Sequence, residues 1–282
     1  MRVSQGAVME KTQYLMESDN EKKRLAVKTD ENEIIEHLKL VSFQGLKNGS
    51  HIVDAGAGVG IVSGVMAEKL KRARKKADIT LLDLSENRLD AAKIRLKNTK
   101  NIRFHFKQCV LEKIPIKSSS VDFIFCRFVF EYLKDKTKVF NELYRILKPG
   151  GTLVTGDLDM NCLCHYPLDS RTERELISIA DSLSKKGLLD FHAGRKLYSY
   201  FYGKRMSKIE VFVTAHHLFY GDMEDRDVYN WENKLNQLIK IQKGRKLEYG
   251  TDILRFKKKF LKFLRSSHRF SYTPYIMVKG LK

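Results

Sequence analysis

The sequence predicts an α/β fold in which helices cover both faces of a mostly parallel β-sheet. Strand-like and helix-like segments alternate through the first half of the chain, which is the pattern of parallel strands joined by helical crossovers. The strand-like segments are short and rich in Ile, Val and Phe, as expected for a sheet buried on both faces. The length of 282 residues suits one such domain with an elaborated cap.

The first half of the chain supplies the expected core elements. Strands are predicted at residues 51–55, 78–83, 102–108, 121–127 and 152–157. An amphipathic helix is predicted at residues 31–44, and further helices at 61–72, 86–97 and 136–147. After Asp157 the pattern changes: helices are predicted at 171–186, 227–244 and 252–266, and strands at 208–215 and 271–278.

The most informative motif is a loop with glycines at positions 56, 58 and 60, directly after the first strand. Gly56 and Gly58 permit positive φ and carry no Cβ, so a ligand can approach the backbone, and the following helix points its N-terminal amides at the loop. Asp54 precedes the first glycine, and Asp83 ends the next strand, where a carboxylate accepts hydrogen bonds from ribose hydroxyls. This spacing is that of a nucleoside-binding Rossmann half.

Two nucleoside ligands fit this geometry. A dinucleotide brings a pyrophosphate, which prefers uncompensated amides at the start of the helix. An acid at the front of the loop fits a cationic ligand better, because Asp54 would face the sulfonium and amino groups of S-adenosylmethionine. The loop chemistry therefore favours S-adenosylmethionine.

Four ordered segments resemble the motifs of the class I S-adenosylmethionine-dependent methyltransferases. Residues 53–60 are similar to the first motif of that family, and 83–97 to its ribose-binding acid and following helix. Residues 114–125 resemble the segment that leads into its fourth strand, and 147–154 the turn that enters the fifth. The resemblance implies a Rossmann-like sheet of about seven strands and the transfer of a methyl group from S-adenosylmethionine.

The family closes its sheet with an antiparallel pair, to which the strands at 208–215 and 271–278 correspond. Residues 221–268 between them are then a long helical insertion. We expect an N-terminal helical segment over the cofactor site (1–45), a cofactor-binding core (46–160), and a third part (161–282) that ends the sheet and carries an acceptor-binding cap. The alternative is that the inserted helices thicken the core or mediate dimerisation.

The resemblance also implies site residues. Asp54, Ala55, Gly56 and Gly58 would hold the methionine end of the cofactor, Asp83 the ribose, and Leu84 would flank the adenine. Where the family often has an adenine-binding acid, this chain has Val110. Adenine recognition would then fall to the backbone of Val110 and Leu111 or to Gln108.

Three further residues have two interpretations each. Arg127 follows the fourth strand, where the family lines its methyl-transfer chamber, but it could also be a sheet-end arginine paired with Glu131. Tyr14 and Arg24 resemble an N-terminal segment that folds over the cofactor in some small-molecule methyltransferases, where Arg24 would meet the methionine carboxylate. An ordinary solvent-facing helix is the alternative for this segment.

Methyl transfer from a sulfonium is an in-line displacement that needs alignment and exclusion of water more than acid–base chemistry. Candidate acceptor-side bases are His216, His217 and Tyr132, followed by Tyr220 and His192. His216 and His217 follow a predicted strand, so one imidazole should face the crevice and the other the opposite side. The alternative is that both are structural histidines.

Other features narrow the function class. The cluster Cys162-Leu-Cys164-His165 lacks the ligand spacing of a zinc site, so no metal is expected and free thiols are the default. The first 28 residues are too charged for a secretory signal, and the most apolar run, 121–133, is interrupted by charges. We expect a cytoplasmic protein without a membrane partner.

The net charge of +19 raises the option of a nucleic-acid partner. The basic residues, however, lie in separate segments, mostly on solvent-facing helix surfaces. No Asn-Pro-Pro-Tyr-like tetrapeptide follows the fourth strand, as it does in amino-directed nucleic-acid methyltransferases. A small-molecule methyltransferase is favoured over an RNA or protein methyltransferase, and over a non-catalytic nucleoside-binding scaffold. The acceptor, its atom and the oligomeric state, including a dimer, stay open.

Overall fold

The computed structural model describes residues 31–97, 99, 101–245 and 248–282. These residues form one eight-stranded sheet in the order β3-β2-β1-β4-β5-β8-β6, and β7 pairs with β8 outside this path. The strands are β1 (Ser50–Ala55), β2 (Ala77–Asp83), β3 (Ile102–Gln108), β4 (Val121–Arg127), β5 (Leu147–Leu158), β6 (Cys164–Tyr166), β7 (Ser207–Tyr220) and β8 (Phe270–Leu281). β1 to β5 run parallel, whereas β8 is antiparallel to β5, β6 and β7.

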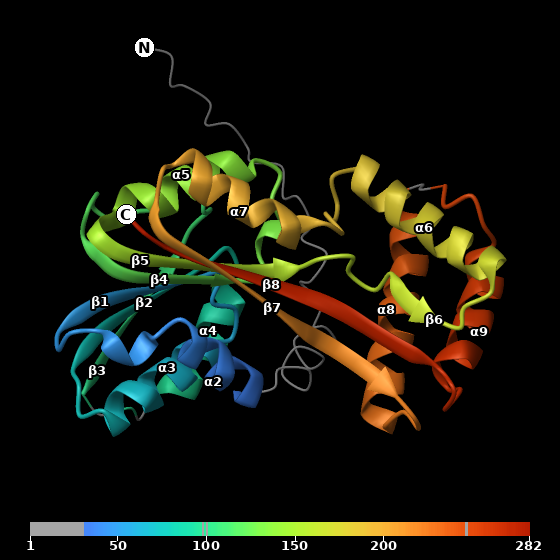
Figure 1. The fold of residues 1–282 in the computed structure, drawn as a ribbon, viewed down its shortest axis with the longest axis horizontal. Helices are drawn as coiled ribbons and strands as arrows, with labels where there is room; N and C mark the ends of the chain where they lie inside the picture. Colours follow the sequence, from blue (N-terminus) through green and yellow to red (C-terminus); the bar gives the residue numbers. More distant parts are fainter. Residues whose placement is uncertain (1–30, 98, 100, 246–247) are drawn as a thin grey trace, which may run out of the picture.

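Helices cover both faces of the parallel part of the sheet (Figure 1). One face carries α2 (Glu31–Leu40), α3 (Ile61–Arg72) and α4 (Glu86–Leu96), and the other carries α5 (Lys136–Ile146) and α7 (Ala193–Gly203). Two short 3₁₀ helices, η1 (Phe43–Gly45) and η2 (Phe130–Tyr132), lie in connecting segments. The fold class expected from the sequence is confirmed.

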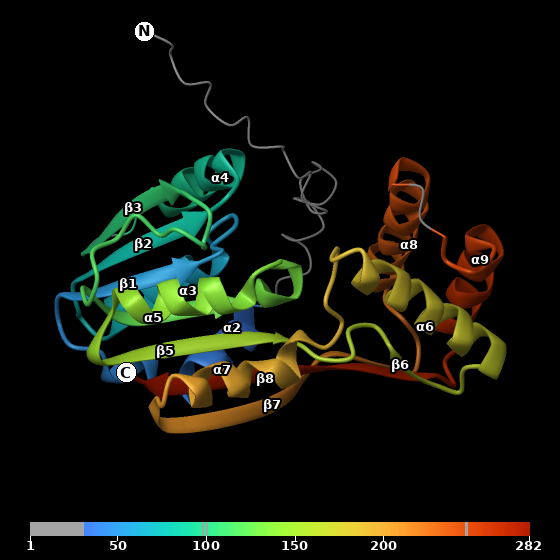
Figure 2. The same ribbon diagram turned by 90° about the horizontal axis from the view of Figure 1, so that it is seen from above.

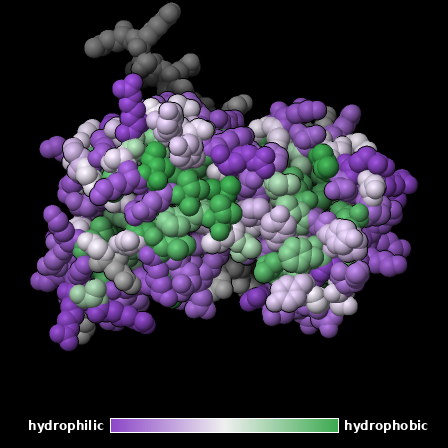
Figure 3. Space-filling view, in the orientation of Figure 1, coloured by the Kyte–Doolittle hydropathy of each residue, from purple (hydrophilic) through white to green (hydrophobic). Residues whose placement is uncertain are grey.

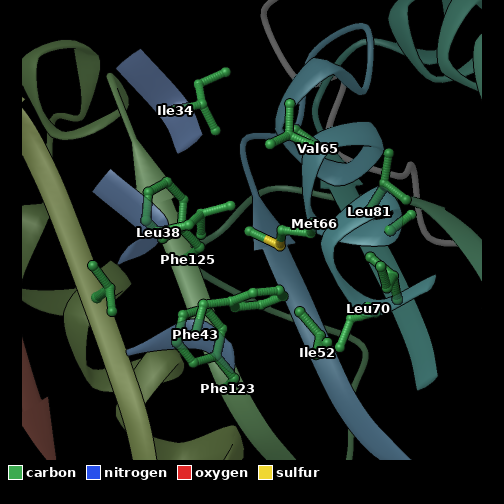
Figure 4. Packing of buried hydrophobic residues seen from close by; sticks show 14 of the residues in the cluster. Ile34, Leu38, Phe43, Ile52, Val65, Met66, Leu70, Leu81, Phe123 and Phe125 are labelled. Atoms are coloured by element: carbon green, nitrogen blue, oxygen red, sulfur yellow. The ribbon is translucent and has the colours of Figure 1, made fainter. Parts of the chain in front are cut away.

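The core on the first face is built from side chains of α2 and α3 against the middle of the sheet. Figure 4 shows Leu38 and Met66 in this layer, facing Ile52 of β1 and Phe125 of β4. The Phe43 ring meets the Phe123 ring edge-on, with centroids 5.1 Å apart. This packing fixes α2 against the sheet, and α2 in turn carries a residue of the candidate site.

A second lobe stands beside the core lobe and contains α6 (Ser170–Lys185), α8 (Asp225–Arg245) and α9 (Ile253–Leu264). β7 and β8 extend from the core sheet into this lobe, as Figures 1 and 2 show. The lobe has a hydrophobic cluster of its own, in which Trp231, Tyr249 and Phe260 are buried. The antiparallel pair and the helices between its strands were expected from the sequence.

Three elements differ from the expectation. The sheet has eight strands rather than about seven, because the three-residue strand β6 pairs with β8. β5 begins at Leu147 instead of residue 152, with a register shift between Val121 and Phe123 of its partner β4. α7 was not predicted: its buried residues Ala193, Leu197 and Phe201 recur at helical spacing, but intervening tyrosines hide this pattern.

Hydrophilic side chains cover most of the rim of both lobes, and apolar side chains gather over the middle of the core lobe (Figure 3). The outer residues of β7 contribute exposed apolar side chains, among them Val211 and Val213. Among the residues that the structure describes, no helix has the length and apolar character needed to cross a lipid bilayer.

Candidate active site

The glycine loop joins β1 to α3 at the carboxyl edge of the sheet. Gly56, Gly58 and Gly60 all have positive φ, of +77°, +53° and +77°. A Cβ atom on Gly56 would lie 2.3 Å from Cγ2 of Val129, and one on Gly60 would lie 2.9 Å from Cβ of Ala92. A Cβ on Gly58 would meet nothing within 4 Å. Two glycines are therefore required by packing, whereas Gly58 leaves its backbone open to a ligand.

Asp54 lies at the front of this loop and is only 3% exposed. The hydroxyl of Ser63 donates a hydrogen bond of 2.6 Å to its Oδ2 atom. Burial raises the pKa of Asp54 to about 6, and the nearby carboxylate of Asp83 adds to the shift, while Ser63 and Arg127 oppose it. A cationic ligand beside Asp54 would favour its charged form.

Asp83 connects the glycine loop to the end of β2. Its Oδ2 atom accepts a hydrogen bond of 2.8 Å from the amide of Gly58, and Oδ1 accepts one of 2.9 Å from the amide of Ser85. The register pairs Ala55 at the end of β1 with Leu82, so the two strands end side by side. A carboxylate has about four lone-pair positions, so Asp83 retains capacity to accept ribose hydroxyls.

The expected adenine-side residues lie beyond the end of β3. Gln108 donates a hydrogen bond of 3.0 Å from Nε2 to the carbonyl of Leu84, and the amide of Cys109 donates to the carbonyl of Asp83. The Leu84 side chain is exposed, Val110 is half-buried, and Leu111 belongs to the hydrophobic core. Gln108 is thus engaged in holding the loop that carries Leu84.

Arg127 pairs with an acid that the sequence did not suggest. Its Nη2 atom lies 2.6 Å from Oε2 of Glu33 on α2, so the alternative in which Arg127 pairs with Glu131 is wrong. The guanidinium stacks 4.0 Å from the centroid of the Phe128 ring and 5.4 Å from that of Tyr275. Residue 131 lies on η2, past the sheet end, whereas the packing of α2 brings Glu33 to the end of β4.

Glu33 also holds one of the candidate bases. Its Oε1 atom lies 2.7 Å from Nδ1 of His216 on β7. Burial alone would raise the pKa of Glu33, but the hydrogen bond from His216 and the charge of Arg127 outweigh it and lower the pKa to about 2. Because the partners lie 94 and 183 positions away in the chain, no local pattern distinguishes Glu33 from its acidic neighbours.

A second group of buried acids lies at the ends of β4 and β5. Glu131 accepts a hydrogen bond of 2.8 Å from Nδ2 of Asn161, and its own amide donates to Asp157 at 3.0 Å. Burial, together with the charge of Glu131, raises the pKa of Asp157 well above its usual range. Tyr132, a candidate base, ends η2 beside Glu131 and is half-buried.

A cavity of about 400 Å³ lies between β7 and α8. Its lining comes from α2, from β7, and from α8 with the turn before it, and comprises Glu33, Ala215, His216, His217, Leu218, Phe219, Glu224, Arg226, Asp227, Asn230, Trp231 and Lys234. The structure thus brings His216 and His217 together with Glu33 at one wall of a cavity large enough for a small molecule.

His216 and His217 both line this cavity, so the expectation that they would face opposite sides is wrong. The reason is a register shift in β7: Ala215 pairs with Pro274, whereas His217 already pairs with Thr273. An extra residue at this point breaks the alternation of side chains along the strand. The two imidazole rings lie 4.2 Å apart.

The other acceptor-side candidates are dispersed. The side chain of Tyr220 is exposed and does not line the cavity, whereas Trp231, which was not among the candidates, is buried and lines it. His192 directly precedes α7 and is not part of the lining.

Tyr14 and Arg24 lie outside the residues that the structure describes. In the cluster Cys162-Leu-Cys164-His165, both ring nitrogens of His165 form hydrogen bonds. Nδ1 lies 2.8 Å from Ser271 Oγ, and Nε2 lies 2.9 Å from the carbonyl oxygen of Cys162.

Comparison with known proteins supports the interpretation of the core. Residues 53–155 match the family model of the methyltransferase domain. A malonyl-[acyl-carrier protein] O-methyltransferase from Marinomonas sp. (strain MWYL1) is 29% identical over 125 residues, which are 44% of this chain and 44% of that protein. The C-methyltransferase UbiE of ubiquinone/menaquinone biosynthesis from Vibrio cholerae is 26% identical over 115 residues, 40% of this chain and 43% of that protein. The chain therefore matches less than half the length of these curated relatives.

Solved structures share the fold over most of the chain. Phosphoethanolamine N-methyltransferase 2 from Haemonchus contortus has a TM-score of 0.57 at 18% identity, covering 94% of this chain and 57% of that one. A putative methyltransferase from Bacillus halodurans also has a TM-score of 0.57, at 16% identity, covering 89% of this chain and 99% of that one. Residues 53–155 therefore match a methyltransferase domain, and the fold of most of the chain is the one found in these solved methyltransferases.

Proposed function

We propose that this protein transfers a methyl group from S-adenosylmethionine to a small-molecule acceptor. The observation that carries the proposal is the loop after β1, where the open backbone at Gly58 lies between the buried carboxylates of Asp54 and Asp83. This arrangement suits a nucleoside with a cationic group, because Asp83 accepts hydrogen bonds from hydroxyls and Asp54 compensates a positive charge.

We assign each end of the cofactor to part of this site. Asp54, Ala55, Gly56 and Gly58 would bind the methionine end, and Asp83 the ribose. Leu84, whose side chain is exposed, would flank the adenine, and the backbone of Val110 and Leu111 would bind its polar edge. Arg127 would lie between the cofactor and the acceptor, since its charge acts on both Asp54 and Glu33.

The cavity between β7 and α8 is our candidate for the acceptor pocket. With the imidazole of His216 donating from Nδ1 to Glu33, its Nε2 atom carries the lone pair and can take a proton from a hydroxyl or amine acceptor. His217 and Tyr132 are the further candidates for this role. The second lobe would then act as the acceptor-binding cap.

The similar proteins described above are an O-, a C- and an N-methyltransferase, so they differ in the acceptor atom. None of them therefore assigns an acceptor to this chain. An RNA or protein acceptor is the second candidate, favoured by the net charge of +19. A cytoplasmic location, supported by four free cysteines, belongs to the proposal as well. A dimer is compatible with it.

Isothermal calorimetry tests the cofactor assignment. S-adenosylmethionine and S-adenosylhomocysteine should both bind, because the adenosine and amino-acid ends make most of the expected contacts. A nicotinamide dinucleotide is the control for the alternative ligand. If the dinucleotide binds and neither adenosyl compound does at millimolar concentration, the methyltransferase proposal is wrong.

A further inference from the structure

The carboxylates that line the cavity between β7 and α8 all have basic partners. Glu33 lies between Arg127 and His216. Arg226 lies 3.5 Å from Glu224 and 3.7 Å from Asp227 at the mouth of the cavity. Each of the three carboxylates in the wall thus has a basic side chain of the protein within 4 Å, and Glu224 and Asp227 share Arg226.

Lys234 on α8 differs from these paired groups, because it is a cation with no carboxylate partner among the described residues. Its ammonium group donates to Sγ of Cys162 at 3.2 Å and stands 4.6 Å from the centroid of the Trp231 ring. An ammonium has three donors, and a sulfur atom is a weak acceptor. Lys234 therefore offers uncompensated charge and hydrogen-bond donors to the contents of the cavity.

Asn230 lies one helical turn before Lys234 and lines the same wall. Its side chain is only 8% exposed, yet Oδ1 has no hydrogen-bond partner in the described structure. A buried amide oxygen or nitrogen without a partner is unfavourable, and a bound polar ligand would supply the missing hydrogen bond. The orientation of the amide is interchangeable, so Asn230 can present either its oxygen or its NH₂ group to that ligand.

A second basic side chain, Arg269, lies near Lys234, since the charges of both act on His165. Arg269, only 2% exposed, lies behind Phe219 of the lining, with its guanidinium carbon 6.0 Å from the ring centroid. Its Nε and Nη2 atoms have no hydrogen-bond partner among the described residues. Burial lowers the pKa of the neighbouring His165 to about 4, and the charges of Lys234 and Arg269 act in the same direction. Arg269 thus supports the positive charge of Lys234 from behind the lining, while Asp227 and Asp222 are the acids whose charges act on Arg269 itself.

We propose that the methyl acceptor carries an anionic group, a carboxylate or a phosphate, which binds at Lys234 and Asn230 while the nucleophilic atom faces His216 on the opposite wall. The inference rests on the proposed function for the link to methyl transfer, and on the cavity alone for the anion site. It deepens that function by naming a substrate class, which is a small anionic molecule.

Trp231 makes the test direct, because it is the single tryptophan of the chain and lies under the Lys234 ammonium. Its selectively excited fluorescence is titrated with malonate and with inorganic phosphate, at an ionic strength held constant with chloride. Ethanolamine serves as the cationic probe of similar size. We expect a saturable change with at least one of the two anions, and the tighter of them identifies the group as carboxylate or phosphate.

Substitutions on α8 separate the specific site from general charge. Lys234→Met removes the ammonium and should weaken anion binding about tenfold or more, as expected for a lost hydrogen bond to a charged group. Lys234→Arg should retain binding within a few-fold. Lys240→Met, at an exposed position of the same helix, lowers the net charge equally and should leave the affinity unchanged.

Three results would overturn the proposal: no saturable response to either anion, a response to ethanolamine in its place, or equal anion affinity in Lys234→Met and Lys240→Met. Calorimetry with S-adenosylhomocysteine on the same preparations distinguishes this failure from failure of the proposed function. Cofactor binding without anion binding refutes the acceptor class only. Anion binding without cofactor binding refutes the methyltransferase proposal and leaves the anion site in place.

Discussion

Gly56 and Gly58 make a matched pair for testing how the glycine loop works. Both have positive φ, and alanine at either position pays the same type of conformational cost. They differ in their surroundings: a Cβ on Gly56 collides with Val129, and a Cβ on Gly58 points into open space. The substitutions Gly56→Ala and Gly58→Ala should therefore damage different properties of the protein.

The expected magnitudes follow from these contacts. Left-handed backbone costs alanine about 1–2 kcal/mol relative to glycine. The 2.3 Å approach to Cγ2 of Val129 adds about 1–3 kcal/mol of overpacking for Gly56→Ala. We expect the free energy of unfolding to fall by about 2–5 kcal/mol for Gly56→Ala and by about 1–2 kcal/mol for Gly58→Ala.

Ligand binding should respond differently from stability. The Cβ of Gly58→Ala fills the space along which the cofactor would approach, so affinity for S-adenosylhomocysteine should drop about tenfold or more, equivalent to about 1.4 kcal/mol. Urea unfolding measures the stabilities, and calorimetry on the folded variants measures the affinities. Wild-type affinity in Gly58→Ala would show that this side of the loop does not face the ligand. Equal destabilisation of the two variants would remove the contact with Val129 from the explanation.

Three further predictions concern charged groups. Asp83→Ala should weaken S-adenosylmethionine binding by about 1.5–3 kcal/mol in calorimetry, and an unchanged affinity would exclude Asp83 from the site. Because the pKa of Asp54 is raised to about 6, affinity for the cationic cofactor should be about tenfold lower at pH 5 than at pH 7, and Asp54→Asn should flatten this profile. Glu33 has its pKa lowered from 4.5 to about 2, so its stabilising effect is present above pH 4.5 and is lost as the pH falls towards 2. The stability difference between wild type and Glu33→Gln in urea unfolding should shrink by about 3 kcal/mol across that window, and a constant difference would contradict the assignment of the pKa.

The sequence predicted most of the sheet because the information is local. β4 is a short, mostly apolar run, β3 alternates apolar and polar residues, and the loop after β1 has glycines at the positions where the backbone turns. β6 escaped prediction because three residues carry no periodicity, and it exists only through pairing with β8. α7 was not predicted because Gly194 and several tyrosines obscure its helical pattern. Gly194 is required there because the carbonyl oxygen of Asp157 approaches it closely.

The candidate site likewise contains residues that the local sequence predicts and residues that only tertiary packing brings together. Asp54 and Asp83 could be proposed from the sequence because Asp54 adjoins the glycine loop and Asp83 ends the next strand. Glu33 was missed because only the tertiary packing of α2 brings it to Arg127 and His216. The predicted orientation of the His216 and His217 side chains was wrong, because the sequence of one strand does not reveal a register shift in its pairing with another strand.

The pairing of β7 with β8 has a consequence for how this protein could have acquired α8 and α9 of its second lobe. Tyr220 and Phe270 are direct partners at the far end of the ribbon, so the 49 residues between them leave and return at neighbouring positions, like a loop grafted onto a hairpin tip. Exchange of this segment, together with α6, which packs against it, would leave the pairing of β7 with β8 and the glycine loop in place. Under the proposed function, such an exchange would alter the acceptor site and leave the cofactor site in place.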